Sequence, residues 1–184
     1  MKTVGLLLAA GHSRRFGAED KLLADFRGRP LIRHAADALR AAGFDALVAV
    51  VGTDAVAAEL GGFTVIRPET GVADQSTSLR AGIRFIDATD ANAVVVALAD
   101  MPLIGAGHLR AVAAHLRSDR PAAATDGKRP MPPAGFPRAM FAALLSSTGD
   151  RGARTLLRGL PQGALVAVDP GLLRDIDVPT DLAD

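Results

Sequence analysis

Short apolar runs alternate with helically patterned segments along the chain. Several of these runs are apolar at every position, or nearly so, as in strands that are covered on both faces of a sheet. The strongest is Ala93–Asp100. We expect strands at Thr3–Leu8, Ala46–Gly52, Phe63–Arg67, Ala93–Asp100, Ala122–Thr125 and Ala164–Asp169.

Between these runs, apolar residues recur at helical spacing. The first helix should start at Pro30 and end before Gly43, a common C-terminal stop. Asp54 is the expected N-cap of a second helix, and a hydroxyl residue within Ser76–Ser78 that of a third. The segment 126–138 carries four prolines, so we expect no regular structure there. Further helices are expected near Gly107–Arg117, Ala139–Leu145 and Ala153–Leu157.

The alternation of strands and helices predicts a three-layer α/β domain with a mostly parallel sheet. No internal repeat, low-complexity tract or linker divides the chain, so we expect one domain over residues 1–184. In such sheets ligands bind outside the carboxyl ends of the strands. The residues that follow each strand are therefore the candidates for function.

Composition narrows the class of protein. The net charge of +1 argues against a nucleic-acid binder held by a wide basic surface. No cysteine is present, which excludes disulfides and thiolate metal sites. No apolar run approaches the ~20 residues of a membrane span. Val4–Ala10 is expected to be a strand rather than a signal peptide, and the cytoplasm is the expected location.

The loop after the first expected strand gathers positive charge. Gly11 and Gly17 would let the backbone approach a ligand closely, and Arg14, Arg15 and Lys21 bring three cations to one strand end. A triphosphate is a suitable anion for guanidinium, ammonium and backbone N–H groups. Neither GxxxxGK[ST] nor GxGxxG is present. The alternative is a solvated turn whose arginines point into water.

Several stretches in order along the chain resemble one superfamily. They are LLLAAGHSRRFGAEDKLL, SLRAGI, LADMPLI, GDRGARTLL and DIDVPTDL. They resemble the MobA-like NTP transferases, and within these most of all the molybdenum cofactor cytidylyltransferases. The resemblance implies a Rossmann-like nucleotide-diphospho-sugar transferase fold and transfer of CMP from CTP to a phosphorylated acceptor, with Mg²⁺ as cofactor. It makes a molybdopterin-type cofactor the leading acceptor and a molybdoenzyme a candidate partner.

The resemblance also assigns roles to residues. It implies nucleotide contacts from Leu8, Ala9, Ala10, Gly11, Arg15, Lys21, Gln75 and Ser78. It implies catalytic roles for Arg15, Lys21 and Asp100, metal binding by Asp100 and Asp177, and acceptor contacts from Arg151 and Arg154.

Structural alternatives accompany these roles. Asp100 is expected at the end of a strand, where it either binds Mg²⁺ together with phosphate oxygens or only caps a turn. Asp177 either binds the metal or caps the last helix. Ser78 either helps to hold the nucleotide at a helix N-terminus or only caps that helix. Arg154 either meets the acceptor's phosphate or pairs with Asp150 at the surface.

The sequence departs from the family pattern in two places. Val178 replaces a threonine in the closing motif, and Met131–Pro133 stands where the cytidylyltransferases typically carry Gly-His-Pro. Because that loop helps to shape the acceptor pocket in the family, a sugar or polyol phosphate is the second candidate acceptor. A non-catalytic protein that binds a nucleotide or cofactor for a molybdoenzyme is a third alternative. Asp175 and Asp181 are expected to be structural.

Ala10 bears on the choice of base. This chain has LAAG where the related guanylyltransferases typically have LAGG. The extra methyl group would narrow the space for a purine, so we expect CTP to be preferred over GTP.

Overall fold

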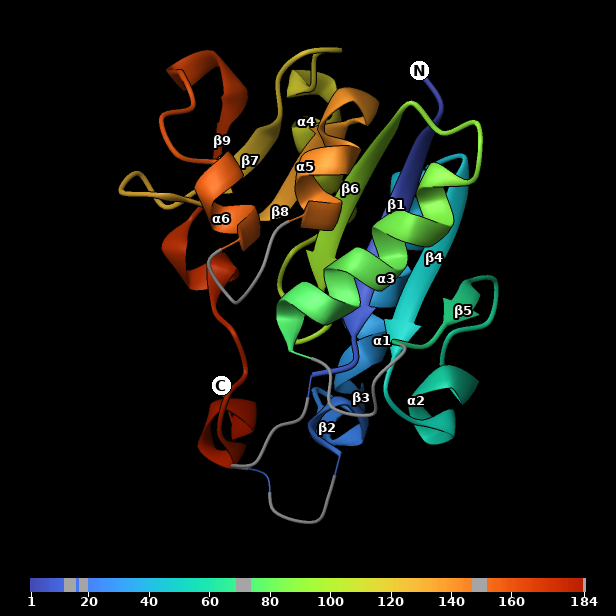
Figure 1. Ribbon diagram of the computed structural model, residues 1–184. Helices are drawn as coiled ribbons and strands as arrows, with labels where there is room; N and C mark the ends of the chain where they lie inside the picture. Colours follow the sequence, from blue (N-terminus) through green and yellow to red (C-terminus); the bar gives the residue numbers. More distant parts are fainter. Residues whose placement is uncertain (12–15, 17–19, 69–73, 147–151, 184) are drawn as a thin grey trace.

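A seven-stranded sheet runs through the centre of the computed structural model, which describes residues 1–11, 16, 20–68, 74–146 and 152–183 (Figure 1). The strands follow one another across the sheet in the order β5 (Thr64–Ile66), β4 (Ala46–Val51), β1 (Thr3–Ala9), β6 (Ala93–Leu98), β8 (Pro130–Pro137), β7 (Ala122–Thr125) and β9 (Leu165–Ala167). β8 runs antiparallel to its neighbours, and the other strands share one direction. The mostly parallel sheet expected from the sequence is confirmed.

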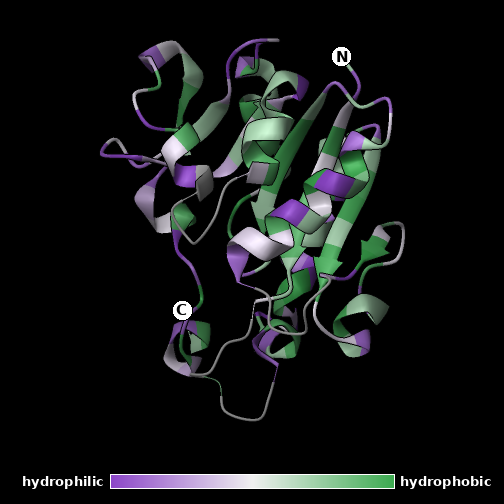
Figure 2. Cartoon of the chain, viewed as in Figure 1, coloured by the Kyte–Doolittle hydropathy of each residue, from purple (hydrophilic) through white to green (hydrophobic). Residues whose placement is uncertain are grey.

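Helices cover both faces of this sheet, which gives three layers. One face carries α1 (Leu31–Ala42), α2 (Asp54–Ala58) and α4 (Ala106–His115), and the other α3 (Gln75–Asp87), α5 (Phe141–Ser146) and α6 (Gly152–Leu156). Alternate side chains of β1 enter the two cores: Leu7 packs on the first face and Leu6 on the second. Figure 2 shows the apolar strands between the helices, several of which expose polar residues.

The proline-rich segment contradicts the sequence expectation. Residues 126–138 were expected to lack regular structure, yet Pro130–Pro137 form β8 in the interior of the sheet. The register with β7 passes from Ala134 directly to Met131, so Pro132 and Pro133 lie in a bulge. Proline has no N–H to donate, and a bulge asks for none, which is why the strand tolerates both residues.

Two helix caps also differ from expectation. The N-cap of α2 is Thr53, whose side chain accepts a hydrogen bond from the backbone N–H of Val56; the expected cap, Asp54, is the first helical residue. The N-cap of α3 is Asp74, which accepts from the N–H of Thr77 at 2.6 Å, and not a hydroxyl residue of 76–78. Both errors arise because several adjacent side chains were capable of capping.

The C-terminal segment returns to the carboxyl ends of the central strands. The backbone N–H of Ile176 donates to the carbonyl of Asp100 at 2.9 Å, and the side chains of Leu173 and Ile176 are buried. Beyond this point a 3₁₀ turn, Pro179–Ala183, packs against β2 (Asp25–Phe26), which forms a small hairpin with β3 (Arg29–Pro30). The segment thus carries its aspartates to the end of β6.

No helix in the described ranges is long and apolar enough to cross a membrane.

Gly82 lets α3 approach β1 closely. A Cβ atom there would lie 2.7 Å from both methyl carbons of Leu6, whose side chain is fully buried. Gly82→Ala should lower the free energy of unfolding by ~1–3 kcal/mol, the usual cost of overpacking a core, even though alanine is the better helix former. Urea denaturation would measure the difference.

Gly107 provides the matched control. It lies in α4, its residue surface is exposed, and a Cβ atom there would meet no described atom within 4 Å. Gly107→Ala should leave the free energy of unfolding unchanged or raise it by up to ~1 kcal/mol. Equal stabilities for the two variants would contradict the close contact at Gly82.

Candidate active site

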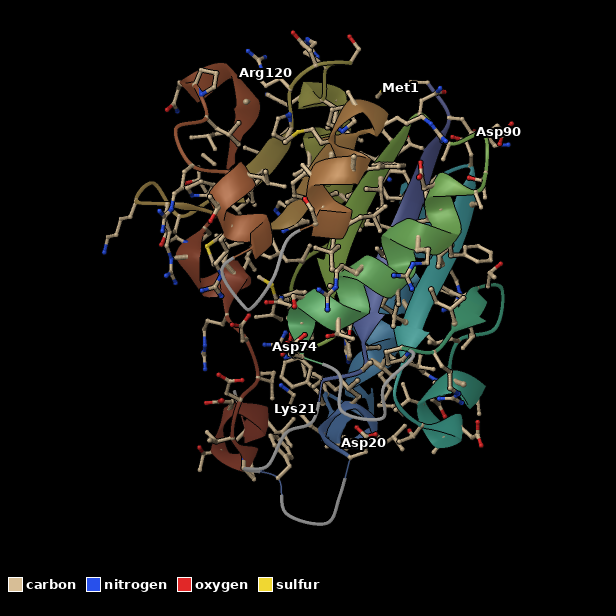
Figure 3. The ribbon with its side chains drawn as sticks, in the orientation of Figure 1. Met1, Asp20, Lys21, Asp74, Asp90 and Arg120 are labelled. Carbon is tan, nitrogen blue, oxygen red and sulfur yellow. The ribbon has the colours of Figure 1, made fainter. Side chains whose placement is uncertain are left out.

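Lys21 is held at the carboxyl end of the sheet by a short 3₁₀ helix, Lys21–Leu23. The Asp20 side chain caps this helix by accepting from the N–H of Leu22 at 3.0 Å, and the Leu22 side chain is buried in the core. The cap and the apolar anchor turn the lysine inward, so that only 8% of Lys21 is exposed. Figure 3 shows Lys21 at the end of the molecule opposite to Met1 and Asp90.

The Lys21 ammonium pairs with two aspartates from distant parts of the chain. Its Nζ lies 2.9 Å from Oδ2 of Asp100, just beyond β6, and 3.6 Å from Oδ1 of Asp177 in the C-terminal segment. Exposure of the side chains rises from 10% for Lys21 to 27% for Asp100 and 55% for Asp177. The structure therefore brings together three of the residues that the sequence nominated, in a cluster that opens toward solvent at Asp177.

Asp175 belongs to the same cluster. Burial of its carboxyl group and then the negative charges of Asp100 and Asp177 raise its pKa to about 6, against the opposing effect of Lys21 and Arg154. The residue as a whole remains exposed, so solvent screens part of this repulsion. Asp175 was expected to be structural, and no motif in the sequence reveals its electrostatic interaction with the site.

Asp181 is structural, as expected. Its carboxylate accepts hydrogen bonds from the backbone N–H groups of Asp177 and Val178 at 2.8 and 3.0 Å, and these bonds lower its pKa. This turn fixes the backbone of Asp177 next to Lys21.

The pair Asp100 and Asp177 suits a magnesium ion. Mg²⁺ in nucleotide sites is bound by one or two carboxylates together with phosphate oxygens and water. Here one oxygen of each carboxylate lies within 3.6 Å of the same nitrogen atom, so both can face one cation. Among the described residues no group of three or more His, Cys, Asp or Glu side chains is arranged to hold a metal. A metal at this site would take its remaining ligands from water or from the phosphates of a nucleotide.

The N-terminus of α3 is already occupied by a carboxylate. Asp74 accepts from the N–H of Thr77 and from the hydroxyl of Ser76, and these hydrogen bonds lower its pKa. The hydroxyl of Ser78 is buried and donates to the carbonyl of Asp74 at 3.1 Å, inside the first turn. This geometry favours the helix-cap alternative for Ser78 over phosphate binding. Gln75 and Ser76 line a neighbouring pocket.

That pocket lies between α3, α6 and the ends of β1, β6 and β8. It is open to solvent, and the empty space in and above it amounts to about 590 Å³. Its lining consists of Leu8, Gln75, Ser76, Leu79, Val96, Leu98, Met131, Pro132, Ala134, Phe136, Arg154 and Leu157. The structure therefore brings the expected nucleotide residues Leu8 and Gln75 to the same pocket as the expected acceptor residue Arg154. The wall from β8 was missed, because no strand was expected at 130–137.

The remaining expected residues divide into two groups. Ala9 and Ala10 are buried at the end of β1, and Gly11 is exposed with open space where a Cβ atom would stand. Arg15 and Arg151 lie outside the described residues.

Residues 5–166 match the model of the MobA-like NTP transferase domain. The chain belongs to this family. The matched range includes Lys21 and Asp100 and ends before Asp177. Purine catabolism protein PucB of Bacillus subtilis (strain 168) is 30% identical over 96% of this chain and 92% of its own length. Molybdenum cofactor guanylyltransferase of Cereibacter sphaeroides is 36% identical over 56% of this chain and 53% of its own length.

A solved structure supports the fold over the whole chain. Rv0371c from Mycobacterium tuberculosis H37Rv superposes with a TM-score of 0.85 at 27% identity, over 100% of this chain and 97% of that protein. Its complex with manganese gives a TM-score of 0.78 at 26% identity with the same coverage. The superfamily and the Rossmann-like fold inferred from the sequence motifs are confirmed, and the chain is a nucleotidyltransferase-type domain.

The raised pKa of Asp175 predicts a pH-dependent stability. The folded protein holds this proton more tightly than the unfolded chain does, so ionisation of Asp175 destabilises the fold. The penalty is absent below pH ~4, grows as the pH rises toward 6, and is constant above that. Asp175→Asn should therefore match the parent near pH ~4 and be more stable above pH ~6 in metal-free buffer, as measured by urea denaturation across the pH range.

Asp181→Asn should change the pH dependence of the free energy of unfolding in the opposite direction. The lowered pKa of Asp181 stabilises the fold above the ordinary value near pH ~4, and this stabilisation is lost as the pH falls through the folded value. The Asn variant should be less stable than the parent at neutral pH and approach it in acid. Stabilisation by both substitutions at pH ~7 would contradict the assignment of charges.

Proposed function

We propose that this chain transfers CMP from CTP to a phosphorylated small molecule and releases pyrophosphate, with a molybdopterin-type cofactor as the leading acceptor. The observation that carries the proposal is the Lys21–Asp100–Asp177 cluster beside the pocket that contains Arg154. Asp175 links the two electrostatically, because the charges of Asp100 and Arg154 both act on its carboxyl group.

The chemistry needs positioning and charge neutralisation more than it needs a base. A phosphate oxygen of the acceptor attacks the α-phosphorus of CTP, the new P–O bond forms, and the bond from the α-phosphorus to the bridging oxygen breaks as pyrophosphate leaves. The acceptor's phosphate is already anionic, so no general base is required. The ammonium of Lys21 would neutralise charge on the leaving pyrophosphate. Mg²⁺ bound by Asp100 and Asp177 would neutralise charge on the phosphates. Arg15 is assigned to the triphosphate by resemblance.

The pocket supports an acceptor with a broad apolar face and one anionic group. Its described walls are mostly aliphatic, and its polar side chains are Gln75, Ser76 and Arg154. A ring system could lie against Leu98 and Phe136 with its phosphate at Arg154, whereas a sugar or polyol phosphate would find few partners for its hydroxyl groups. The names of the two curated relatives, one for purine catabolism and one for the molybdenum cofactor, agree with delivery of the product to a molybdoenzyme. We place this reaction in the cytoplasm.

Asp100→Asn tests the proposal. It preserves the shape of the side chain and removes the charge that Mg²⁺ requires, so pyrophosphate release from CTP and the acceptor should fall by ~10²-fold or more. The matched control is Asp90→Asn, an exposed aspartate at the opposite end of the molecule that pairs with Lys2 (Figure 3). The control should keep the parent activity. Parent activity in Asp100→Asn would show that the metal binds elsewhere.

The unsubstituted protein separates this function from its alternatives. Pyrophosphate release is measured with each of four NTPs and a panel of acceptors that includes molybdopterin cofactor, sugar phosphates and polyol phosphates. Release with the cofactor alone supports the leading acceptor, and release with a sugar or polyol phosphate replaces it. CTP binding without release in any combination would favour the non-catalytic alternative.

The preference for CTP over GTP gives a further prediction. The Ala10 side chain is buried at the point where β1 meets the loop. If this loop lies against the base, the methyl group disfavours a purine, and kcat/KM should favour CTP over GTP by at least about tenfold, which ~1.4 kcal/mol provides. Ala10→Gly should reduce that ratio without abolishing transfer. A preference for GTP in the parent protein would overturn the base assignment.

A further inference from the structure

Lys21 stands where a metal ion would need to be. Its ammonium lies 2.9 Å from Asp100 and 3.6 Å from Asp177, the two carboxylates assigned above to Mg²⁺. The lysine side chain is 10% exposed, so its ammonium is largely shielded from solvent where it meets the two carboxylates. A divalent cation shared by these carboxylates would have to stand next to the ammonium, and two like charges at that distance repel strongly.

We propose that Lys21 is an internal counter-ion that keeps divalent metal away from Asp100 and Asp177 until a nucleoside triphosphate draws the ammonium onto its phosphates. The inference rests on the proposed function in that it uses the same metal ligands and the same nucleotide. It adds that metal alone binds weakly, that nucleotide and metal enter together, and that the lysine exchanges partners in the process.

The surroundings of Lys21 allow this exchange. The Asp20 cap and the buried side chain of Leu22 fix the backbone, so the movement is confined to the flexible lysine stem. The ion pair with Asp177 is longer and more exposed than that with Asp100, so it is the easier of the two to break. A largely buried ammonium is costly without an anionic partner, so its departure from the carboxylates is opposed until another anion is supplied. A triphosphate supplies that anion and also provides the remaining oxygen ligands of the metal.

Binding of Mn²⁺ to the nucleotide-free protein tests the inference without reference to activity. The bound fraction is measured from the loss of the electron paramagnetic resonance signal of the free ion. Lys21→Met removes the charge and retains an apolar stem, and it should bind Mn²⁺ at least about tenfold more tightly than the parent, equivalent to ~1.4 kcal/mol. Lys21→Arg is the matched control, since it keeps the positive charge and should remain as weak as the parent. The added affinity should disappear in Lys21→Met combined with Asp177→Asn.

A second measurement uses the parent protein and does not depend on the folding of any variant. Lys2, Lys21 and Lys128 are the lysines of this sequence. A brief pulse of reductive methylation, followed by mass spectrometry of the peptides, reports how accessible each amine is. Because metal and ammonium compete for the same carboxylates, Mn²⁺ at concentrations high enough to saturate the weak nucleotide-free site should displace the ammonium. Labelling of Lys21 should then rise severalfold, while labelling of the exposed Lys2 and Lys128 stays unchanged.

The outcomes separate the inference from the proposed function. Unchanged Mn²⁺ affinity in folded Lys21→Met, or binding of Mn²⁺ to the parent at Asp177 while Lys21 stays protected from methylation, overturns the inference even if CMP transfer is observed. Tighter Mn²⁺ binding in Lys21→Met, together with no pyrophosphate release by the parent protein from any NTP and acceptor, supports the counter-ion role and refutes the transferase.

Discussion

The buried ammonium of Lys21 is the constraint on which the site depends. A cation with so little exposure requires anionic partners, and here they come from the end of β6 and from the C-terminal segment. Lys21 itself follows the loop after β1, so one ion-pair cluster joins three parts of the chain. The hydrogen bond from Ile176 to the carbonyl of Asp100 joins two of the same parts through the backbone. The geometry of the site and the docking of the C-terminal segment are therefore one structural feature.

The sheet explains why the polar groups gather at this edge. β1 and β6 are buried on both faces, so their interiors accept only apolar side chains. Polar residues are confined to the positions beyond the strands, and adjacent parallel strands end at the same edge. Asp100 lies just past β6 for this reason, and the loop after β1 delivers Lys21 to the same place. The charged residues therefore cluster at this edge because the residues within β1 and β6 are buried.

The sequence predicted the elements that have a local cause. The apolar runs at Thr3–Leu8 and Ala93–Asp100 predicted the central strands, and the position of Asp100 after such a run predicted its place at the sheet edge. The cap of α3 was wrong because Asp74 and the following hydroxyl residues are all good caps, and only the backbone path selects among them. The proximity of Asp175 to Asp100 was missed because it depends on how the C-terminal segment returns across the molecule.

The error at the proline-rich segment also concealed part of the pocket. Single-sequence reasoning treats prolines as breakers because they lack an N–H, but at Pro132 and Pro133 the register with β7 is already interrupted by a bulge. The bulge releases these residues from the ladder and turns Met131 and Pro132 into a wall of the pocket that contains Arg154. This is the same stretch in which the sequence departs from the cytidylyltransferase pattern. The bulge that concealed the strand in the sequence is therefore also what shapes this wall of the pocket. Where pairing with β7 is interrupted, the strand lines the pocket instead.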